Sequence, residues 1–138
     1  MRVVFDANIY VSGFISPKGP SGLLIKKFIN DNVFELIISE EILRETRNSL
    51  KYKKVIKYVK LSGDEIELIL NAISLLATTV NPVFKYQELE EDPDDTKYVN
   101  AALEGRADYI ISGDKHLLGL VEVEGIKIVT ARAFLKLI

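Results

Sequence analysis

The stretch "VVFDAN", residues 3–8, decides which fold we expect for this chain. Val3 to Phe5 is a short apolar run with two β-branched residues, and it stops abruptly at Asp6. Such a run predicts a buried strand. In sheets of parallel strands, ligands bind beyond the carboxyl ends of the strands. Polar residues that directly follow a strand are therefore the first candidates for chemistry, and Asp6 is one of them.

Similar runs recur along the chain and alternate with segments of helical period. The other predicted strands are Val33 to Ile38, Thr78 to Val80, Asp108 to Ser112 and Lys127 to Val129. The predicted helices are 23–29, 39–50, 52–60, 66–76 and 93–104, with a closing helix capped by Thr130. The segment from Ser12 to Ser21 contains two Gly and two Pro and predicts a loop. Strands alternating with helices predict an α/β fold with a parallel sheet that is covered on both faces.

Length, charge and composition limit the class of protein. The chain has 138 residues, which fits a single domain over residues 1–138. It has no cysteine, which excludes disulfides and thiolate metal sites and fits a reducing cytoplasm. No stretch approaches the 18 or more apolar residues of a membrane span. The formal net charge is −2, so any binding to nucleic acid needs a local basic patch.

Two aspartates follow predicted strands and should lie at the same edge of the sheet. Asp6 ends the first strand, and Asp114 comes two residues after the strand Asp108 to Ser112. Each has an ordinary structural explanation, because Asp often begins a turn or caps a helix. The residues alone leave both roles open.

The helix that Ser39 is expected to cap offers three glutamates, and helix geometry separates them. Ile42, Thr46 and other apolar positions form one stripe at about 100° per residue. Glu45 borders this stripe, whereas Glu40 and Glu41 point away from it. The latter two are expected to be solvated acids that favour the helix N-terminus. Glu45 is the one acid of this helix that could reach an inner site.

A second group of acids occurs in "EEDPDDT", residues 90–96. Asp92 followed by Pro93 predicts the N-cap and first position of a helix. Asp94 and Asp95 then fall in the first turn, where negative charge is favourable. Asp95 is four residues before Val99 and faces inward, whereas Asp94 is rotated by about 100°. An inward carboxylate needs a partner, and a shared cation is one.

Four acids are thus expected to face one site: Asp6, Glu45, Asp95 and Asp114. A site made of oxygen ligands suits a hard cation such as Mg²⁺ or Mn²⁺. Zinc is not expected, because the chain has no Cys and only one His, His116. A divalent ion at such a site can activate water against a phosphodiester.

Four motifs together resemble those of the PIN domain, the metal-dependent ribonuclease fold of VapC-type toxins and of several RNA-processing nucleases. They are "VVFDAN" (3–8), "ISEEILRE" (38–45), "DPDDTKYVNAAL" (92–103) and "DYIISGDKHLL" (108–118), and their order and spacing run through nearly the whole chain. The resemblance is greatest to PIN proteins regarded as toxins of toxin–antitoxin pairs. It implies a three-layer α/β/α sandwich with strand order 3-2-1-4-5. It also implies one or two Mg²⁺ or Mn²⁺ ions and hydrolysis of RNA.

The resemblance carries over to individual positions. Asp6, Glu45, Asp95 and Asp114 match the four catalytic acids of the family, with Asp6, Asp95 and Asp114 as metal ligands and Glu45 as ligand or base. Asn8 and Ser112 match polar residues that support the site. The family also implies a homodimer and an antitoxin protein whose segment blocks the site.

A basic segment begins beside Glu45. Seven of the 18 basic residues lie between Arg44 and Lys60, with Tyr52 and Tyr58 among them. The residues expected to contact RNA phosphates are Arg44, Arg47, Lys53, Lys54 and Lys57. The alternative is a lysine-rich solvated face of two helices.

Two other functions compete with a nuclease. A receiver-type phospho-acceptor domain shares the alternating architecture, but it usually has adjacent acids after the first strand, and Asp6 stands between Phe5 and Ala7. A PIN module that binds RNA or acts as a scaffold without catalysis is the second alternative. The complete set of four acids favours an enzyme over this module.

Overall fold

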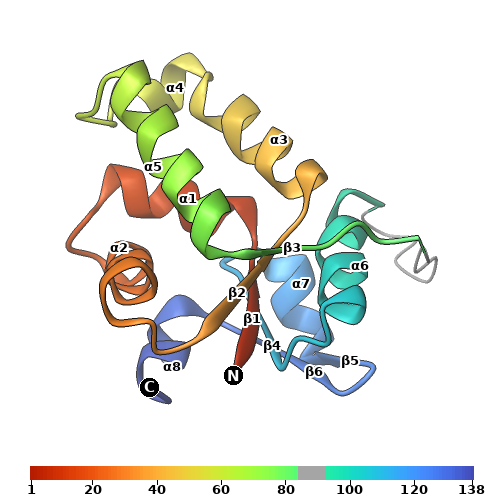
Figure 1. Cartoon of the computed structure of the whole chain (residues 1–138). Helices are drawn as coiled ribbons and strands as arrows, with labels where there is room; N and C mark the ends of the chain where they lie inside the picture. Colours follow the sequence, from red (N-terminus) through yellow and green to blue (C-terminus); the bar gives the residue numbers. More distant parts are fainter. Residues whose placement is uncertain (84–92) are drawn as a thin grey trace.

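The computed structural model describes residues 1–83 and 93–138, and it shows an α/β protein (Figure 1). Its strands are β1 (Arg2–Phe5), β2 (Glu35–Ile38), β3 (Thr78–Thr79), β4 (Tyr109–Ile111), β5 (Glu122–Val123) and β6 (Ile126–Val129). Its longer helices are α1 (Ala7–Ile15), α2 (Pro20–Lys26), α3 (Glu40–Leu50), α5 (Gly63–Leu76) and α6 (Thr96–Glu104). Shorter helices are α4 (Lys53–Ile56), α7 (Lys115–Leu120), α8 (Ala131–Leu135), the π-helix η1 (Lys27–Asp31) and the 3₁₀ turn η2 (Pro93–Asp95).

The sheet has the order β3-β2-β1-β4-β6-β5, with β1 among the central strands. All neighbouring pairs except β5–β6 are parallel. The five predicted strands therefore have the expected order 3-2-1-4-5. The sequence did not predict β5, which has two residues and joins β6 through Glu124 and Gly125, both at positive φ. Such a two-residue turn closes a tight hairpin.

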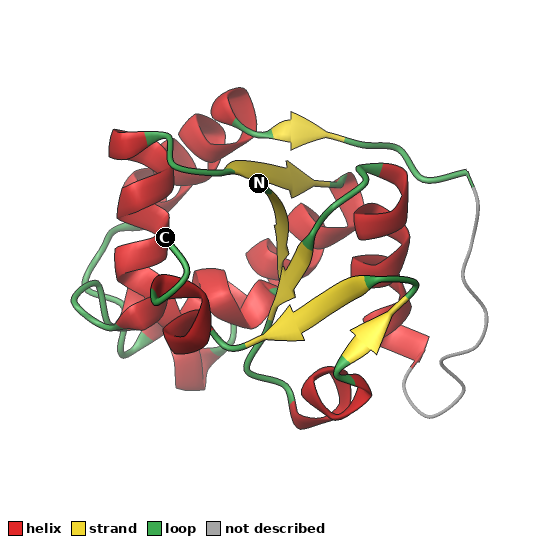
Figure 2. Ribbon diagram, turned by 90° about the horizontal axis from the view of Figure 1, so that it is seen from below, coloured by secondary structure: helices red, strands yellow, loops and turns green. Residues whose placement is uncertain are grey.

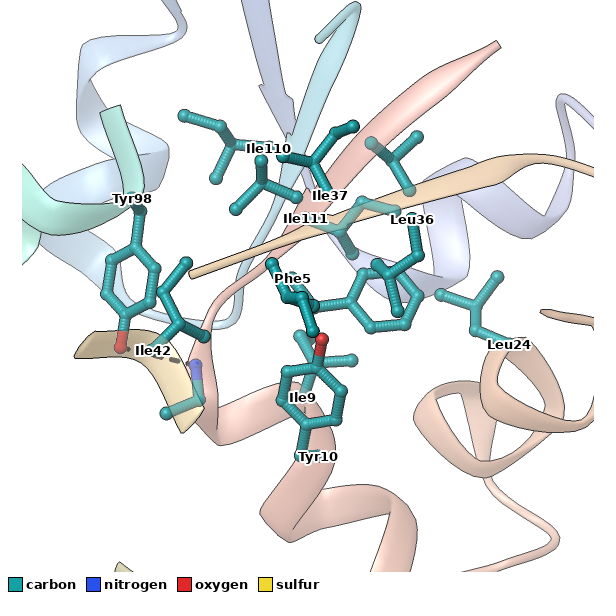
Figure 3. Packing of buried hydrophobic residues seen from close by; sticks show 14 of the residues in the cluster. Phe5, Ile9, Tyr10, Leu24, Leu36, Ile37, Ile42, Tyr98, Ile110 and Ile111 are labelled. Carbon is teal, nitrogen blue, oxygen red and sulfur yellow. Dashed lines mark hydrogen bonds between the residues drawn. The ribbon is translucent and has the colours of Figure 1, made fainter. Parts of the chain in front are cut away.

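Helices cover both faces of the sheet, which confirms the α/β class and agrees with an α/β/α sandwich (Figure 2). The helix α6 packs against β1 and β4, while α1 packs against α2 and α3. Between these layers, Phe5, Leu36 and Ile110 are completely removed from solvent (Figure 3). Val3 to Phe5 are fully buried, as their apolar run predicts.

Strand ends and helix starts coincide along one edge of the sheet. Asp6 follows β1 and caps α1, Ser39 follows β2 and caps α3, and Thr130 follows β6 and caps α8. Each side chain accepts a hydrogen bond from a backbone N–H in the first turn, which satisfies one of the unpaired donors there. The predicted caps Ser39 and Thr130 are therefore confirmed, and Ser62 forms a capping box with Glu65 at the start of α5.

The loop predicted from Ser12 to Ser21 is wrong over most of its length. The helix α1 continues to Ile15, and α2 begins at Pro20. Its glycines permit close packing of these two helices. A Cβ on Gly13 would lie 2.4 Å from the Ile25 side chain, and one on Gly22 would lie 2.3 Å from the backbone of Pro17.

Two helices are shorter than predicted. The segment 52–60 forms only the four-residue α4, and α6 begins at Thr96, after the turn η2. The predicted N-cap Asp92 lies outside the described residues, as do Glu90 and Glu91. None of the helices found in residues 1–83 and 93–138 is long and apolar enough to cross a membrane.

Candidate active site

The register of the central strands brings Asp6 and Ser112 together. Phe5 of β1 pairs with Ile111 of β4, so the residues after them are neighbours at the edge of the sheet. The backbone N–H of Asp6 donates to the carbonyl of Ile111 at 2.9 Å. The Ser112 hydroxyl donates to Oδ2 of Asp6 at 2.6 Å. Ser112, which the sequence predicts to support the site, thus contacts the Asp6 side chain directly.

Asp6 is a carboxylate buried among neutral partners. It is 3% exposed, and its Oδ1 accepts the backbone N–H of Asn8 at 3.1 Å. Burial raises the pKa of Asp6, while the bonds from Ser112 and Asn8 oppose the rise and the charge of Glu45 adds to it. None of the ion pairs found in residues 1–83 and 93–138 includes Asp6. A bound cation would offset the cost of this buried charge.

Asp114 occupies a related place after β4. It caps α7, with Oδ1 accepting the backbone N–H of His116 at 3.0 Å. Its own backbone N–H donates to the Ser112 hydroxyl at 2.9 Å. One serine hydroxyl therefore links the side chain of Asp6 to the backbone of Asp114. Both aspartates do cap helices, so the ordinary structural explanation holds for each, and it does not exclude a second role.

Glu45 reaches the start of α1 through a tyrosine that the sequence did not single out. Oε2 of Glu45 accepts the Tyr98 hydroxyl at 2.8 Å and forms an ion pair with Lys97. The Tyr98 hydroxyl accepts the backbone N–H of Ala7, next to Asp6, at 3.2 Å. Tyr98 lies three residues after Asp95 and therefore on the same face of the chain. The signal for it is weak: Tyr98 directly precedes Val99, and a buried tyrosine hydroxyl usually has a hydrogen-bond partner.

The expected difference between Asp94 and Asp95 is present. Asp95 is 7% exposed, whereas Asp94 is exposed. Asp95 stands at the junction of η2 and α6. This confirms the predicted direction of the two side chains and leaves their chemical roles as predictions.

The predicted metal ligands do not form a compact cluster. Within the part of the chain that the structure describes, no group of three or more His, Cys, Asp or Glu side chains is arranged to hold a metal ion. The structure brings Asp6 to Ser112 and, through Tyr98, close to Glu45, but it does not unite Asp6, Asp95 and Asp114. The donor atoms themselves, buried or half-buried carboxylate oxygens, still suit Mg²⁺ or Mn²⁺.

Two cavities flank these residues. One of about 450 Å³ lies beside the ends of β2 and β3 and is lined by Ser39, Arg44, Asn81 and Lys97, among others. Another of about 420 Å³ lies beyond β4 and β6 and is lined by Asn8, Ser112, Thr130 and Arg132, among others. Open space therefore adjoins Lys97, the partner of Glu45, on one side and Asn8 and Ser112, which contact Asp6, on the other.

The basic segment is exposed, and only its start lies near the candidate site. Arg44 lines the larger cavity, whereas Arg47 forms an ion pair with Glu67 at 3.1 Å. Lys53, Lys54 and Lys57 are exposed on and just after α4. Figure 1 shows α4 at the end of α3 that is far from α6. Glu45 lies halfway along α3, and the helix runs on for about 8 Å from it to Leu50, so these lysines lie beyond the end of α3 that is farther from the sheet.

Comparison with known proteins places the chain in a family. The model of the PIN domain matches residues 2–116. The chain is also 32% identical over 120 residues to the uncharacterized protein MJ1680 of Methanocaldococcus jannaschii, which covers 87% of this chain and 75% of that protein. PIN domains are generally nucleases that use divalent metal ions. On the sheet order, the strand-end acids and this match, the chain belongs to the PIN domain family.

Proposed function

We propose that this chain is a metal-dependent endoribonuclease in which residues 1–138 act as one nuclease domain. The observation that carries the proposal is Asp6, a carboxylate that is 3% exposed at the ligand-binding edge of the sheet and bonded to neutral groups. Such a group is costly in the absence of a cation. Membership of a family of nucleases supplies the kind of reaction.

The proposed metal ligands are Asp6, Asp95 and Asp114, with Mg²⁺ or Mn²⁺ as the ion. A bound ion supplies an activated water and neutralises charge on the scissile phosphate. Ser112 holds Oδ2 of Asp6 in place and also fixes the backbone at Asp114.

Glu45 is the proposed base. Its carboxylate is half-buried and is held at Oε2 by Tyr98 and Lys97. In the proposed reaction, Glu45 takes a proton from the attacking water as the water's oxygen bonds to phosphorus. The bond from phosphorus to the leaving ribose oxygen then breaks, and this oxygen takes up a proton from solvent water. Asn8, two residues after Asp6, supports the site through its backbone N–H, which donates to Oδ1 of Asp6.

The proposed RNA contacts are Arg44, Arg47, Lys53, Lys54 and Lys57. Arg44 is best placed, because it lines the cavity next to Glu45's partner Lys97. The exposed lysines near α4 extend the basic surface away from the site, where they could hold phosphates of a longer strand. Arg47 would have to leave Glu67 to do the same.

We further propose a toxin role with an antitoxin protein and a homodimer. The support from the molecule is an exposed apolar row on α5, where Leu68 is 71% and Leu75 is 86% exposed. Exposed apolar patches of this kind often mark protein contacts. Light scattering of the wild type and a Leu68→Lys/Leu75→Lys variant checks the dimer, which the changes should weaken. Growth arrest on expression, absent for Asp6→Asn, checks the toxin role.

A PIN module without catalysis is the second candidate. The observation in its favour is the lack of a compact carboxylate cluster among residues 1–83 and 93–138. A receiver-type function has no comparable support, since the chain matches the PIN domain over residues 2–116.

A cleavage assay on a pool of short RNAs separates these candidates. Wild-type protein should cleave in Mn²⁺ or Mg²⁺ and stop cleaving in EDTA, whereas a folded Asp6→Asn variant should be inactive in either metal. RNA binding without cleavage, equal in the wild type and the variant, would favour the non-catalytic module.

A further inference from the structure

The Tyr98 hydroxyl joins three helices at the candidate site. It belongs to α6, accepts the backbone N–H of Ala7 in α1 at 3.2 Å, and donates to Oε2 of Glu45 in α3 at 2.8 Å. Figure 3 shows Tyr98 inside the apolar core, and a dashed line marks its bond to the α1 backbone. Ala7 directly follows Asp6, so one hydroxyl fixes Glu45 relative to the residue after Asp6.

The hydroxyl makes these two hydrogen bonds and also lies close enough to Asp6 to lower the pKa of that carboxyl, against the rise that burial causes. A phenol has one proton to donate, and here it goes to Glu45, while a lone pair takes the Ala7 N–H. Tyr98 is 1% exposed, so water cannot readily replace either partner. Burial, together with the charge of Asp6, raises the pKa of Tyr98 above its usual value, so the proton stays in place.

Lys97 does not fix the orientation of the Glu45 carboxylate as Tyr98 does. It pairs with the same oxygen, Oε2, but an ammonium group on a flexible stem is a point charge with little directional preference. Its Nζ also lies 5.7 Å from the centre of the Tyr98 ring. The tyrosine is anchored by packing and by the Ala7 N–H, so it supplies the direction that the lysine lacks.

We propose that Tyr98 is a positioning residue that holds the Glu45 carboxylate at a fixed place relative to Asp6 during RNA hydrolysis. The inference rests on the proposed nuclease function and adds to it a residue outside the four acids. Positioning of this kind matters because a displacement of about 1 Å at a reacting group can cost about 100-fold in rate. The rival explanation is purely structural: Tyr98 merely satisfies the first turn of α1.

A double-mutant cycle on cleavage distinguishes the two explanations. Tyr98→Phe keeps the ring and its packing, and it should lower kcat by about 10-fold or more while KM changes less than about 2-fold. In a Glu45→Gln background, the same change should lower kcat by less than about 2-fold, because its effect passes through Glu45. An equal loss in both backgrounds, or no loss in the wild type, would overturn the proposal.

Tyr10→Phe is the matched control. Tyr10 is also completely buried, but its hydroxyl has no hydrogen-bond partner among the described residues. Removing it deletes a buried hydroxyl without touching Glu45 or Ala7, so kcat and KM should stay at wild-type values. A loss as large as that of Tyr98→Phe would show that any buried hydroxyl matters, and would contradict a specific role for Tyr98.

A second measurement does not depend on cleavage. In a crystal structure of Tyr98→Phe, the Glu45 carboxylate should leave the position that it holds against residue 98 in the wild type or become disordered, whereas in Tyr10→Phe it should stay. A Glu45 that keeps its position in Tyr98→Phe overturns the proposal, whether or not the protein cleaves RNA. Failure of wild-type protein to cleave in Mn²⁺ and Mg²⁺ would instead count against the nuclease function itself.

Discussion

The junctions β1–α1 and β4–α7 have the same local design but different surroundings. In each, an aspartate follows a parallel strand, caps the next helix, and accepts a backbone N–H two residues ahead, at 3.1 Å for Asp6 and 3.0 Å for Asp114. Ser112 contacts both. Yet Asp6 is 3% exposed, in the middle of the sheet, whereas Asp114 is half-buried at the start of a six-residue helix.

The difference shows how far helix capping can explain an aspartate. A half-buried cap such as Asp114 needs no further reason, because solvent helps to stabilise its charge. A cap as buried as Asp6 costs folding free energy, since Ser or Thr would cap α1 without a buried charge. The charge at Asp6 therefore points to a partner that is itself positive, and a divalent ion is the partner that the family uses.

The largest effect on cleavage is expected when the buried carboxylate of Asp95 is compared with the exposed one of its neighbour Asp94. Asp95→Asn should lower cleavage by about 100-fold or more, as expected for loss of a metal ligand. Asp94→Asn should keep most of the activity and lose about 0.3–1 kcal/mol of stability near the helix N-terminus. Rates of RNA cleavage in Mn²⁺ and thermal unfolding measure both. An equal loss of activity in the two variants would mean that burial does not identify the working carboxylate.

The next effect concerns how RNA reaches the acidic edge of the sheet. Neutralising Lys53, Lys54 and Lys57 together should weaken RNA binding and reduce the slope of log K against log salt by up to about two units. These lysines are exposed, and α4 lies at the end of α3 that is far from α6 (Figure 1), so metal affinity should hardly change. The measurement is a salt series with Asp6→Asn protein and short RNAs. An unchanged slope would assign these lysines to a solvated face and leave Arg44 as the main contact.

Stability should depend on pH through Asp6 in the absence of metal. Burial raises the pKa of Asp6 in the folded chain, so the folded state holds this proton more tightly than the unfolded state. That contribution is complete below the unfolded pKa of about 3.9 and is lost as pH rises through the folded pKa. In EDTA, Asp6→Asn should therefore gain stability relative to the wild type as pH rises from about 4, by about 1.4 kcal/mol per unit of pKa shift.

Thermal unfolding across pH measures this gain, and Mn²⁺ provides the control. Saturating Mn²⁺ should stabilise the wild type and not the variant, because the ion binds the folded site. A difference between the two proteins that stays constant with pH would contradict a raised pKa at Asp6.

The smallest effect concerns Tyr10, whose buried hydroxyl has no hydrogen-bond partner in the part of the chain that the structure describes. Tyr10→Phe removes a hydroxyl that is unpaired within the described residues, so the free energy of unfolding should stay the same or rise by up to about 1 kcal/mol. Chemical denaturation measures the change. A clear loss of stability would reveal a partner for this hydroxyl and weaken Tyr10 as a control for Tyr98.

Local signals allowed much of the fold to be predicted, and tertiary contacts account for what was missed. The strand that stops before Asp6, the cap Ser39 and the inward direction of Asp95 each depend on a few neighbouring residues. The helix α1 was missed because it is apolar and buried on nearly all sides, so it lacks the amphipathic period, and Gly13 suggested a loop.

The arrangement around Glu45 could not be predicted in the same way. Its bond to Tyr98 joins residues 53 positions apart and depends on how α3 and α6 pack. Helix rotation indicated that Glu45 and Asp95 face inward, but no periodic pattern tells which side chains meet there. The two-residue strand β5 was not predicted for a related reason, since it is defined by its pairing with β6.

Calorimetric titration with Mn²⁺ tests the central claim, that the buried Asp6 anchors a metal site, most directly. Wild-type protein should bind Mn²⁺, and a folded Asp6→Asn variant should bind at least about 100-fold more weakly, since even residues that only support metal ligands cost 10–100-fold. Asp114→Asn should weaken binding less, because that carboxylate is half-buried and more easily replaced by water. Unchanged Mn²⁺ affinity in folded Asp6→Asn would contradict the claim and leave Asp6 as a helix cap alone.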